Sequence, residues 1–177
     1  MIKNKLFFID AETDGLNGSF ISVAIIVTDM ECKEIERLYC GISKEKLDVK
    51  DEWTIKNVLP ILGQYEEVNN EEELLERVWQ SWEKYSNCAY AIGDVIFPVE
   101  ARLFQKCIMK NVSERGMQGP FPLLDLASLL YANKIDPLCD REKILCNQND
   151  NLQHNALYDV ETMIKIYKYL KEKKQYE

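Results

Sequence analysis

The stretch at residues 5–15, Lys-Leu-Phe-Phe-Ile-Asp-Ala-Glu-Thr-Asp-Gly, joins a short apolar run to three carboxylates. The run at residues 5–9 is typical of a strand that is buried on both faces. Side chains alternate along a strand, so Asp10 and Glu12 are predicted to project from one face, roughly 7 Å apart. Two such acids suit a hard divalent cation, because without one they would repel each other and resist burial. The alternative is that these acids merely begin a solvated turn.

In the rest of the chain, the spacing of apolar residues is typical of strands in some segments and of helices in others. Residues 20–30 and 34–42 read as two further strands, and their short connections favour an antiparallel start. Helical stripes and buried-strand candidates then follow, with helices at 71–85, 99–108, 127–133 and from Asn155 onward, and strands at 88–92 and 123–126. This order predicts an α/β fold with a mixed five-stranded sheet, three antiparallel strands first, flanked by helices. We expect one domain covering residues 1–177.

Composition limits the function classes. Among 177 residues, 46% are apolar and 29% charged, which excludes a disordered chain, and no apolar run approaches the ~18 residues of a membrane span. A carboxylate at Asp10 comes too early for a secretory signal, so we expect a cytoplasmic protein. The net charge of −8 argues against binding nucleic acid through a broad basic patch but leaves binding through metal ions open. The six cysteines show no Cys-x-x-Cys pair and are interpreted as reduced thiols.

A second group of polar residues lies near the C-terminus, in the sequence His154-Asn155-Ala156-Leu157-Tyr158-Asp159. Five steps along a helix turn it by about 500°, so His154 and Asp159 cannot share a face of one helix. They can meet if His154 lies on the loop before the helix and Asp159 in its early turns. Asp159 then suits a metal ligand and His154 a proton acceptor near neutral pH. The alternative is a surface histidine and an Asp placed only to favour the helix dipole.

Taken together, FFIDAETDGL (residues 7–16) and HNALYD (residues 154–159) resemble the motifs of DEDDh 3′–5′ exonucleases, which have a ribonuclease H-like fold. The resemblance implies that Asp10, Glu12 and Asp159 bind two Mg²⁺ or Mn²⁺ ions and that His154 is the general base. It implies a nucleic-acid partner, the 3′ end of RNA or single-stranded DNA, with small stand-alone exoribonucleases the most similar group. The lack of a long apolar run leads us to expect no membrane partner, and a homodimer stays open. Tyrosine-type relatives would place Tyr where Asn155 stands, so the histidine type is favoured.

The family requires one more acid, usually an Asp in a phrase such as N-x-x-F-D, and this chain departs from that phrase. In the family, a pair of apolar residues follows this acid by three and four positions. Leu103 and Phe104 follow Glu100 at the same spacing, so Glu100 is the predicted fourth metal ligand. Asp94 is the fallback.

Two other functions compete with the nuclease. A strand followed by Asp10-x-Glu12 is similar to the start of haloacid-dehalogenase-like phosphatases, but their second Asp is absent and the motif at residues 154–159 stays unexplained. A non-catalytic interaction module of the same fold is favoured only if Glu100 cannot complete the metal site.

Overall fold

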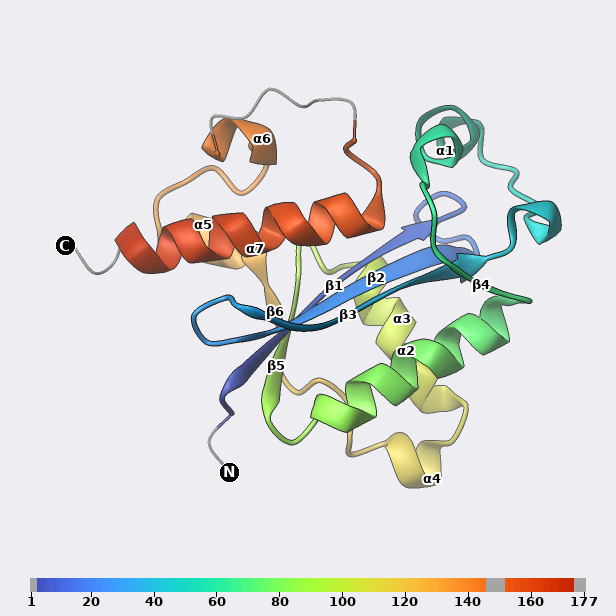
Figure 1. Cartoon of the computed structure of the whole chain (residues 1–177), viewed down its shortest axis with the longest axis horizontal. Coiled ribbons are helices and arrows are strands. Elements are labelled where there is room, and N and C mark those ends of the chain that lie inside the picture. The colour runs from blue at the N-terminus through green and yellow to red at the C-terminus, as the bar shows by residue number, and fades with distance from the viewer. Residues whose placement is uncertain (1–2, 146–151, 174–177) are drawn as a thin grey trace.

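The strands form one mixed sheet at the centre of the computed structural model, which describes residues 3–145 and 152–173. The sheet order is β4-β3-β2-β1-β5-β6, and β1 and β2 form its middle (Figure 1). The neighbours β1–β2 and β2–β3 are antiparallel, whereas β1–β5, β5–β6 and β3–β4 are parallel. The strands are β1 (Lys5–Thr13), β2 (Phe20–Asp29), β3 (Glu34–Ile42), β4 (Glu66–Val68), β5 (Ala89–Gly93) and β6 (Leu123–Asp125).

The predicted mixed sheet with three antiparallel strands first is confirmed, but the count of five strands is wrong. The sixth strand is β4, a three-residue edge strand that pairs Cys40, Gly41 and Ile42 of β3 with Glu66, Glu67 and Val68. Two exposed glutamates and one buried valine are too short a pattern to indicate a strand. The first strand, β1, continues to Thr13, so Asp10 and Glu12 lie near its end and alternate as predicted.

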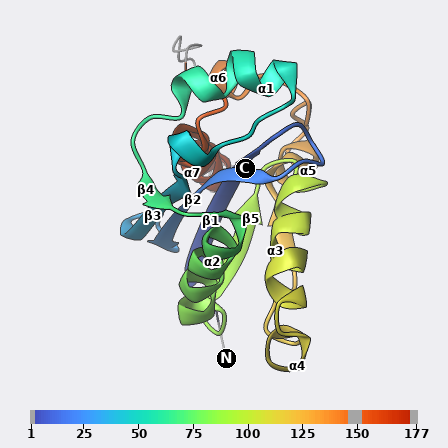
Figure 2. The same ribbon diagram turned by 90° about the vertical axis from the view of Figure 1, so that its right-hand side faces the viewer.

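Helices cover both faces of the sheet (Figures 1 and 2). One face carries α2 (Glu71–Tyr85), α3 (Val99–Met109) and α4 (Val112–Arg115). The other carries α5 (Leu126–Ala132), α6 (Arg141–Ile144) and α7 (Ala156–Lys173). The connection from β3 to β4 holds the short 3₁₀ helices η1 (Lys44–Lys46) and η2 (Leu59–Ile61), with α1 (Glu52–Asn57) between them.

The alternation of side chains along β1 divides the apolar core into two parts. Phe7 and Ile9 pack in the core under α2 and α3, where the Phe7 ring meets the Trp82 ring edge to face at 5.2 Å. Leu6 and Phe8 pack on the opposite side, in the core under α5 and α7. Asp10 and Glu12 continue the series of Leu6 and Phe8, so the two acids face α7.

The predicted helix starts follow local hydrogen bonding. The Asn70 side chain accepts a 2.9 Å hydrogen bond from the Glu73 N–H and caps α2. The Glu73 carboxylate accepts from the N–H of Asn69, one residue before the position that a reciprocal capping box uses. Asn155 directly precedes α7, as predicted.

The five cysteines in the described parts of the chain are free thiols, and two of them, Cys40 and Cys107, are buried. The sixth, Cys146, lies outside the described residues. Within residues 3–145 and 152–173, no helix combines the length and the apolarity that crossing a membrane requires.

Candidate metal centre and active site

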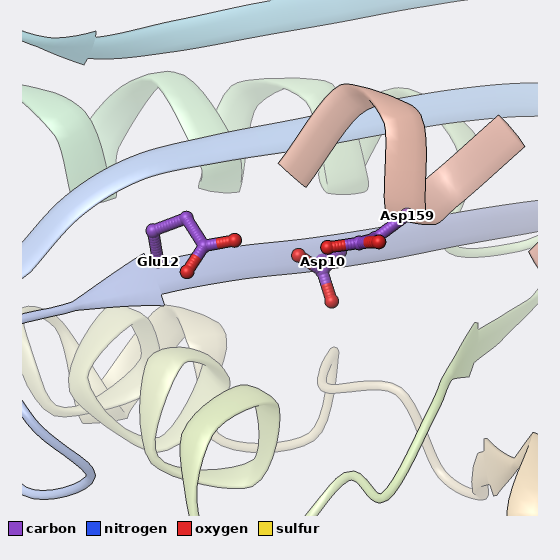
Figure 3. Close-up of side chains that lie close together, drawn as sticks. All are labelled: Asp10, Glu12 and Asp159. Atoms are coloured by element: carbon purple, nitrogen blue, oxygen red, sulfur yellow. The ribbon is translucent and has the colours of Figure 1, made fainter. Parts of the chain in front are cut away.

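Three carboxylates from distant parts of the chain converge where β1 meets the start of α7. Asp10 and Glu12 project from β1, and Asp159 projects from the first turns of α7 (Figure 3). One carboxylate oxygen of each residue lies within 4.8 Å of the corresponding oxygens of the other two. We call these three residues the acid cluster.

Asp159 is held in place by the N-terminus of its own helix. Its Oδ2 accepts a 2.9 Å hydrogen bond from the backbone N–H of His154. Asn155 caps the helix, because its Oδ1 accepts from the N–H of Tyr158 at 3.1 Å and its carbonyl accepts from the N–H of Asp159 at 2.9 Å. The predicted arrangement, His154 on the loop and Asp159 in the early turns, is therefore what the structure has.

The acid cluster has no cationic side chain among the described residues to stabilise its ionised form. Burial raises the pKa of Asp10 well above its ordinary value, and the charges of Asp159 and Glu12 raise it further. The pKa of Glu12 is raised for the same reasons, first by burial and then by Asp159 and Glu100. Burial also raises the pKa of Asp159 to about 7, although the His154 N–H partly offsets this. No lysine or arginine of residues 3–145 and 152–173 forms an ion pair with any of the three. Three such oxygen donors fit a hard divalent cation.

Glu100 lies beside the acid cluster and is not a member of it. It occupies the first turn of α3 and is 3% exposed. Burial raises its pKa to about 8. A Cβ atom at Gly93 would lie 3.2 Å from the Glu100 Cγ, so the absence of a side chain at Gly93 gives Glu100 its place beside β1.

Asp94, the fallback for the fourth acid, is already paired. Both of its carboxylate oxygens accept hydrogen bonds from Arg141, at 2.6 Å from Nε and 2.9 Å from Nη2. This bidentate pair uses the orientation in which Arg binds carboxylates best. Asp94 therefore has its charge compensated by the protein, whereas Glu100 does not.

His154 lies next to the acid cluster with an unusual backbone and an aromatic neighbour. Its φ of 71° is in the left-handed region, and its imidazole packs edge to face against the Trp53 indole with centroids 4.8 Å apart. Its side chain reaches the surface, yet the surrounding protein lowers its pKa below 6.5 by desolvation. A lowered pKa favours the neutral imidazole, the form that accepts a proton.

A cavity of about 440 Å³, large enough for a nucleotide-sized ligand, opens beside the acid cluster, although Glu12 and Glu100 do not line it. The acids Asp10 and Asp159 line it together with His154. Apart from Asp94, sequence reasoning missed the other lining residues, among them Arg141 and Glu142 of α6. A helix of four residues leaves no periodic pattern, and only the pairing of Arg141 with Asp94 reveals its role.

Sequence reasoning also missed how the loop after β1 is fixed. The Arg102 guanidinium on α3 donates to the carbonyls of Asn17 and Gly18, at 2.8 and 2.6 Å, and stacks over the Phe20 ring at 4.6 Å. A lone arginine on a helix gives no sign of such a contact in the sequence.

Comparison with known proteins identifies the fold. No protein-family model and no curated protein sequence matches the chain. Escherichia coli exonuclease I in a zinc-bound complex with single-stranded DNA matches 97% of this chain with a TM-score of 0.68 and 17% identity. The same enzyme with a dA16 oligonucleotide matches 96% of this chain with a TM-score of 0.69 and 16% identity. Exonuclease I from Methylocaldum szegediense matches 96% of this chain with a TM-score of 0.64 and 16% identity.

These likenesses show that the chain shares the fold of exonuclease I, which fits the ribonuclease H-like fold that the two sequence motifs imply. The matched region covers 40–41% of the length of each of those chains, so this chain spans about two fifths of them.

Proposed function

We propose that the chain is a metal-dependent 3′–5′ exonuclease that removes nucleotides from the 3′ ends of single-stranded DNA or RNA. The observation that carries the proposal is the convergence of Asp10, Glu12 and Asp159 into one uncompensated, largely buried cluster. Such a cluster lowers stability unless a cation joins it, and folds retain unfavourable clusters of this kind chiefly at functional sites.

The acid cluster would hold two divalent ions, Mg²⁺ or Mn²⁺, with Glu100 completing the set of four carboxylates. The donors are all oxygens, which suits these ions and not a structural zinc. Bound there, the ions would polarise the phosphodiester and lower the pKa of the attacking water. Glu100 is the better fourth acid because its carboxylate has no cationic partner in the described part of the chain, whereas Asp94 is paired with Arg141.

His154 would act as the general base. Its neutral imidazole takes a proton from water as the water oxygen attacks the phosphorus, and the bond to the leaving 3′ oxygen breaks. The proton then passes to the leaving oxygen, so the products are a nucleoside 5′-monophosphate and a strand shortened by one residue with a new 3′ hydroxyl. The bond from the His154 N–H to Asp159 keeps base and acid cluster together.

The substrate class is supported by the fold and by charge. Two of the exonuclease I structures that share this fold hold single-stranded DNA or a dA16 oligonucleotide, and the metal ions would supply the positive potential that a chain of net charge −8 lacks. RNA is the substrate that the resemblance of the sequence motifs favours. Side-by-side assays on ribo- and deoxyribo-oligonucleotides of one sequence decide between them.

The test is digestion of 5′-labelled oligonucleotides in the presence of Mn²⁺. We expect a ladder that shortens from the 3′ end and that is lost in Asp10→Asn and Asp159→Asn. Glu172→Gln is the matched control, because it removes one negative charge from an exposed position at the end of α7. A ladder that persists in both cluster variants would refute the proposal.

The assay also separates the two alternatives. Release of inorganic phosphate from a phosphomonoester, with no shortening of the strand, would favour the phosphatase. Binding of an oligonucleotide without turnover would favour the non-catalytic module.

A further inference from the structure

The short helix α1 is fixed to the loop that follows the acids of β1. The Asp14 carboxylate accepts hydrogen bonds from the N–H groups of Lys50, at 3.1 Å, and Asp51, at 2.7 Å. The Thr54 hydroxyl oxygen accepts from the N–H of Gly15 at 3.0 Å. Thr54 is 1% exposed, and Asp51 caps the helix through the Thr54 N–H at 2.8 Å. The start of α1 therefore cannot move independently of the loop after Glu12.

The segment after α1 is fixed to the second motif. The Asn155 Nδ2 donates a 2.6 Å hydrogen bond to the carbonyl of Ile61 in η2. Asn155 is also the residue that caps α7 and the neighbour of His154. One short stretch of chain thus links the two motifs whose acids form the cluster.

Trp53, the second residue of α1, makes the aromatic contact to His154. The indole and imidazole centroids lie 4.8 Å apart at an interplanar angle of 83°, the edge-to-face geometry that aromatic pairs prefer. The only hydrogen bond that His154 forms with another described residue comes from its backbone N–H, so no described hydrogen bond orients the imidazole. The indole is the described aromatic group that restricts rotation of that ring.

We propose that Trp53 is a positioning residue of this site, which holds the His154 imidazole in the orientation it needs beside the cavity lined by Asp10 and Asp159. The expected effect of Trp53 on the cleavage rate rests on the proposed function. The expected effect of Trp53 on the orientation of the imidazole rests on the aromatic contact alone. A base must be held close to the proton it abstracts, so a freely rotating imidazole would lower the rate of the chemical step.

The structural consequence is measurable without activity, because His154 is the only histidine of the chain. Its two carbon-bound ring protons give a single pair of proton NMR signals, which the indole ring current displaces. At pH 8, we expect Trp53→Ala to move both signals toward the positions of histidine in an unstructured peptide. Ile55→Ala, an exposed apolar residue of the same helix, is the control and should leave them in place. Unchanged signals in Trp53→Ala would overturn the inference whatever the activity.

The kinetic consequence is tested by a double-mutant cycle under single-turnover conditions. We expect Trp53→Ala to lower the rate of cleavage at saturating enzyme by at least ~3-fold, with little change in KM, and Trp53→Phe to restore most of it. In the His154→Ala background, Trp53→Ala should have no further effect, because its role acts through the imidazole.

An equal rate loss in both backgrounds would overturn the inference, since Trp53 would then act on the substrate or the fold directly. An inactive wild-type protein would refute the proposed function instead, and the NMR signals would still decide whether the contact exists.

Discussion

Asp159→Asn should change stability with opposite signs in the absence and presence of metal. Without metal, the Asp159 carboxyl has a pKa of about 7 in the folded protein against an ordinary value of 3.8. The folded state therefore binds more protons than the unfolded state between about pH 4 and pH 7, and stability falls as the pH rises through this range. The full penalty for the ionised group corresponds to roughly 4 kcal/mol. The charge on Asp159 also raises the pKa of Asp10 and Glu12, so its removal relieves them as well.

The measurement is thermal unfolding by circular dichroism in EDTA at pH 5 and pH 8, then at pH 8 with Mn²⁺. At pH 8 in EDTA, we expect Asp159→Asn to be more stable than wild type by about 2–4 kcal/mol, a difference in Tm on the order of 10 °C. At pH 5 the difference should fall to less than half of that, because Asp159 is still protonated in the folded protein although it is already ionised in the unfolded chain. Added Mn²⁺ should stabilise wild type more than the variant. The histidine titration is common to both proteins and cancels in the difference.

The control is Glu172→Gln, which should show no pH-dependent difference from wild type. A variant that is less stable than wild type at pH 8 in EDTA, or a difference that is the same at both pH values, would contradict the reasoning. In that case Asp159 would be neutralised within the folded chain, and the acid cluster would not need a cation.

Three other expectations follow from the same geometry. His154→Ala should lower kcat by ~10²–10⁴ and leave Mn²⁺ affinity by calorimetry little changed, and equal kcat would remove His154 from the mechanism. Glu100→Gln should weaken Mn²⁺ binding by roughly 10-fold or more, while Asp94→Asn has the smaller effect, since Asp94 is bound to Arg141. A larger loss of Mn²⁺ affinity in Asp94→Asn than in Glu100→Gln would make Asp94 the fourth acid. Asn155→Ala should lower the free energy of unfolding in urea by about 1 kcal/mol, because α7 loses its cap, and an unchanged midpoint would show that the cap contributes nothing.

The parts of the fold that the sequence predicts are those with local signals. The apolar run before Asp10 and the capping residue Asn70 each determine an element by nearest-neighbour effects, and both appear where expected. The edge strand β4 was not predictable, because its existence depends on pairing with β3 and not on its own three residues.

Some features of the candidate site also follow from local sequence patterns, whereas others depend on tertiary contacts. Strand alternation places Asp10 and Glu12 on one face, and helix geometry places His154 before Asp159, so three of the four predicted acids come together in space. Whether Glu100 or Asp94 joins them depends on which acid an arginine neutralises. That arginine, Arg141, stands 47 residues after Asp94, in a four-residue helix that is too short to leave a periodic pattern. The aromatic contact between Trp53 and His154 likewise depends on tertiary structure alone.

The anomalous signal of manganese in a crystal soaked in Mn²⁺ tests most directly whether the acid cluster binds metal. We expect strong peaks between the carboxylate oxygens of Asp10, Glu12 and Asp159, with Glu100 at their edge, and loss of those peaks in Asp10→Asn. Manganese bound only at other places on the protein, with the acid cluster empty in the same crystal, would contradict the central claim that these acids form a metal centre.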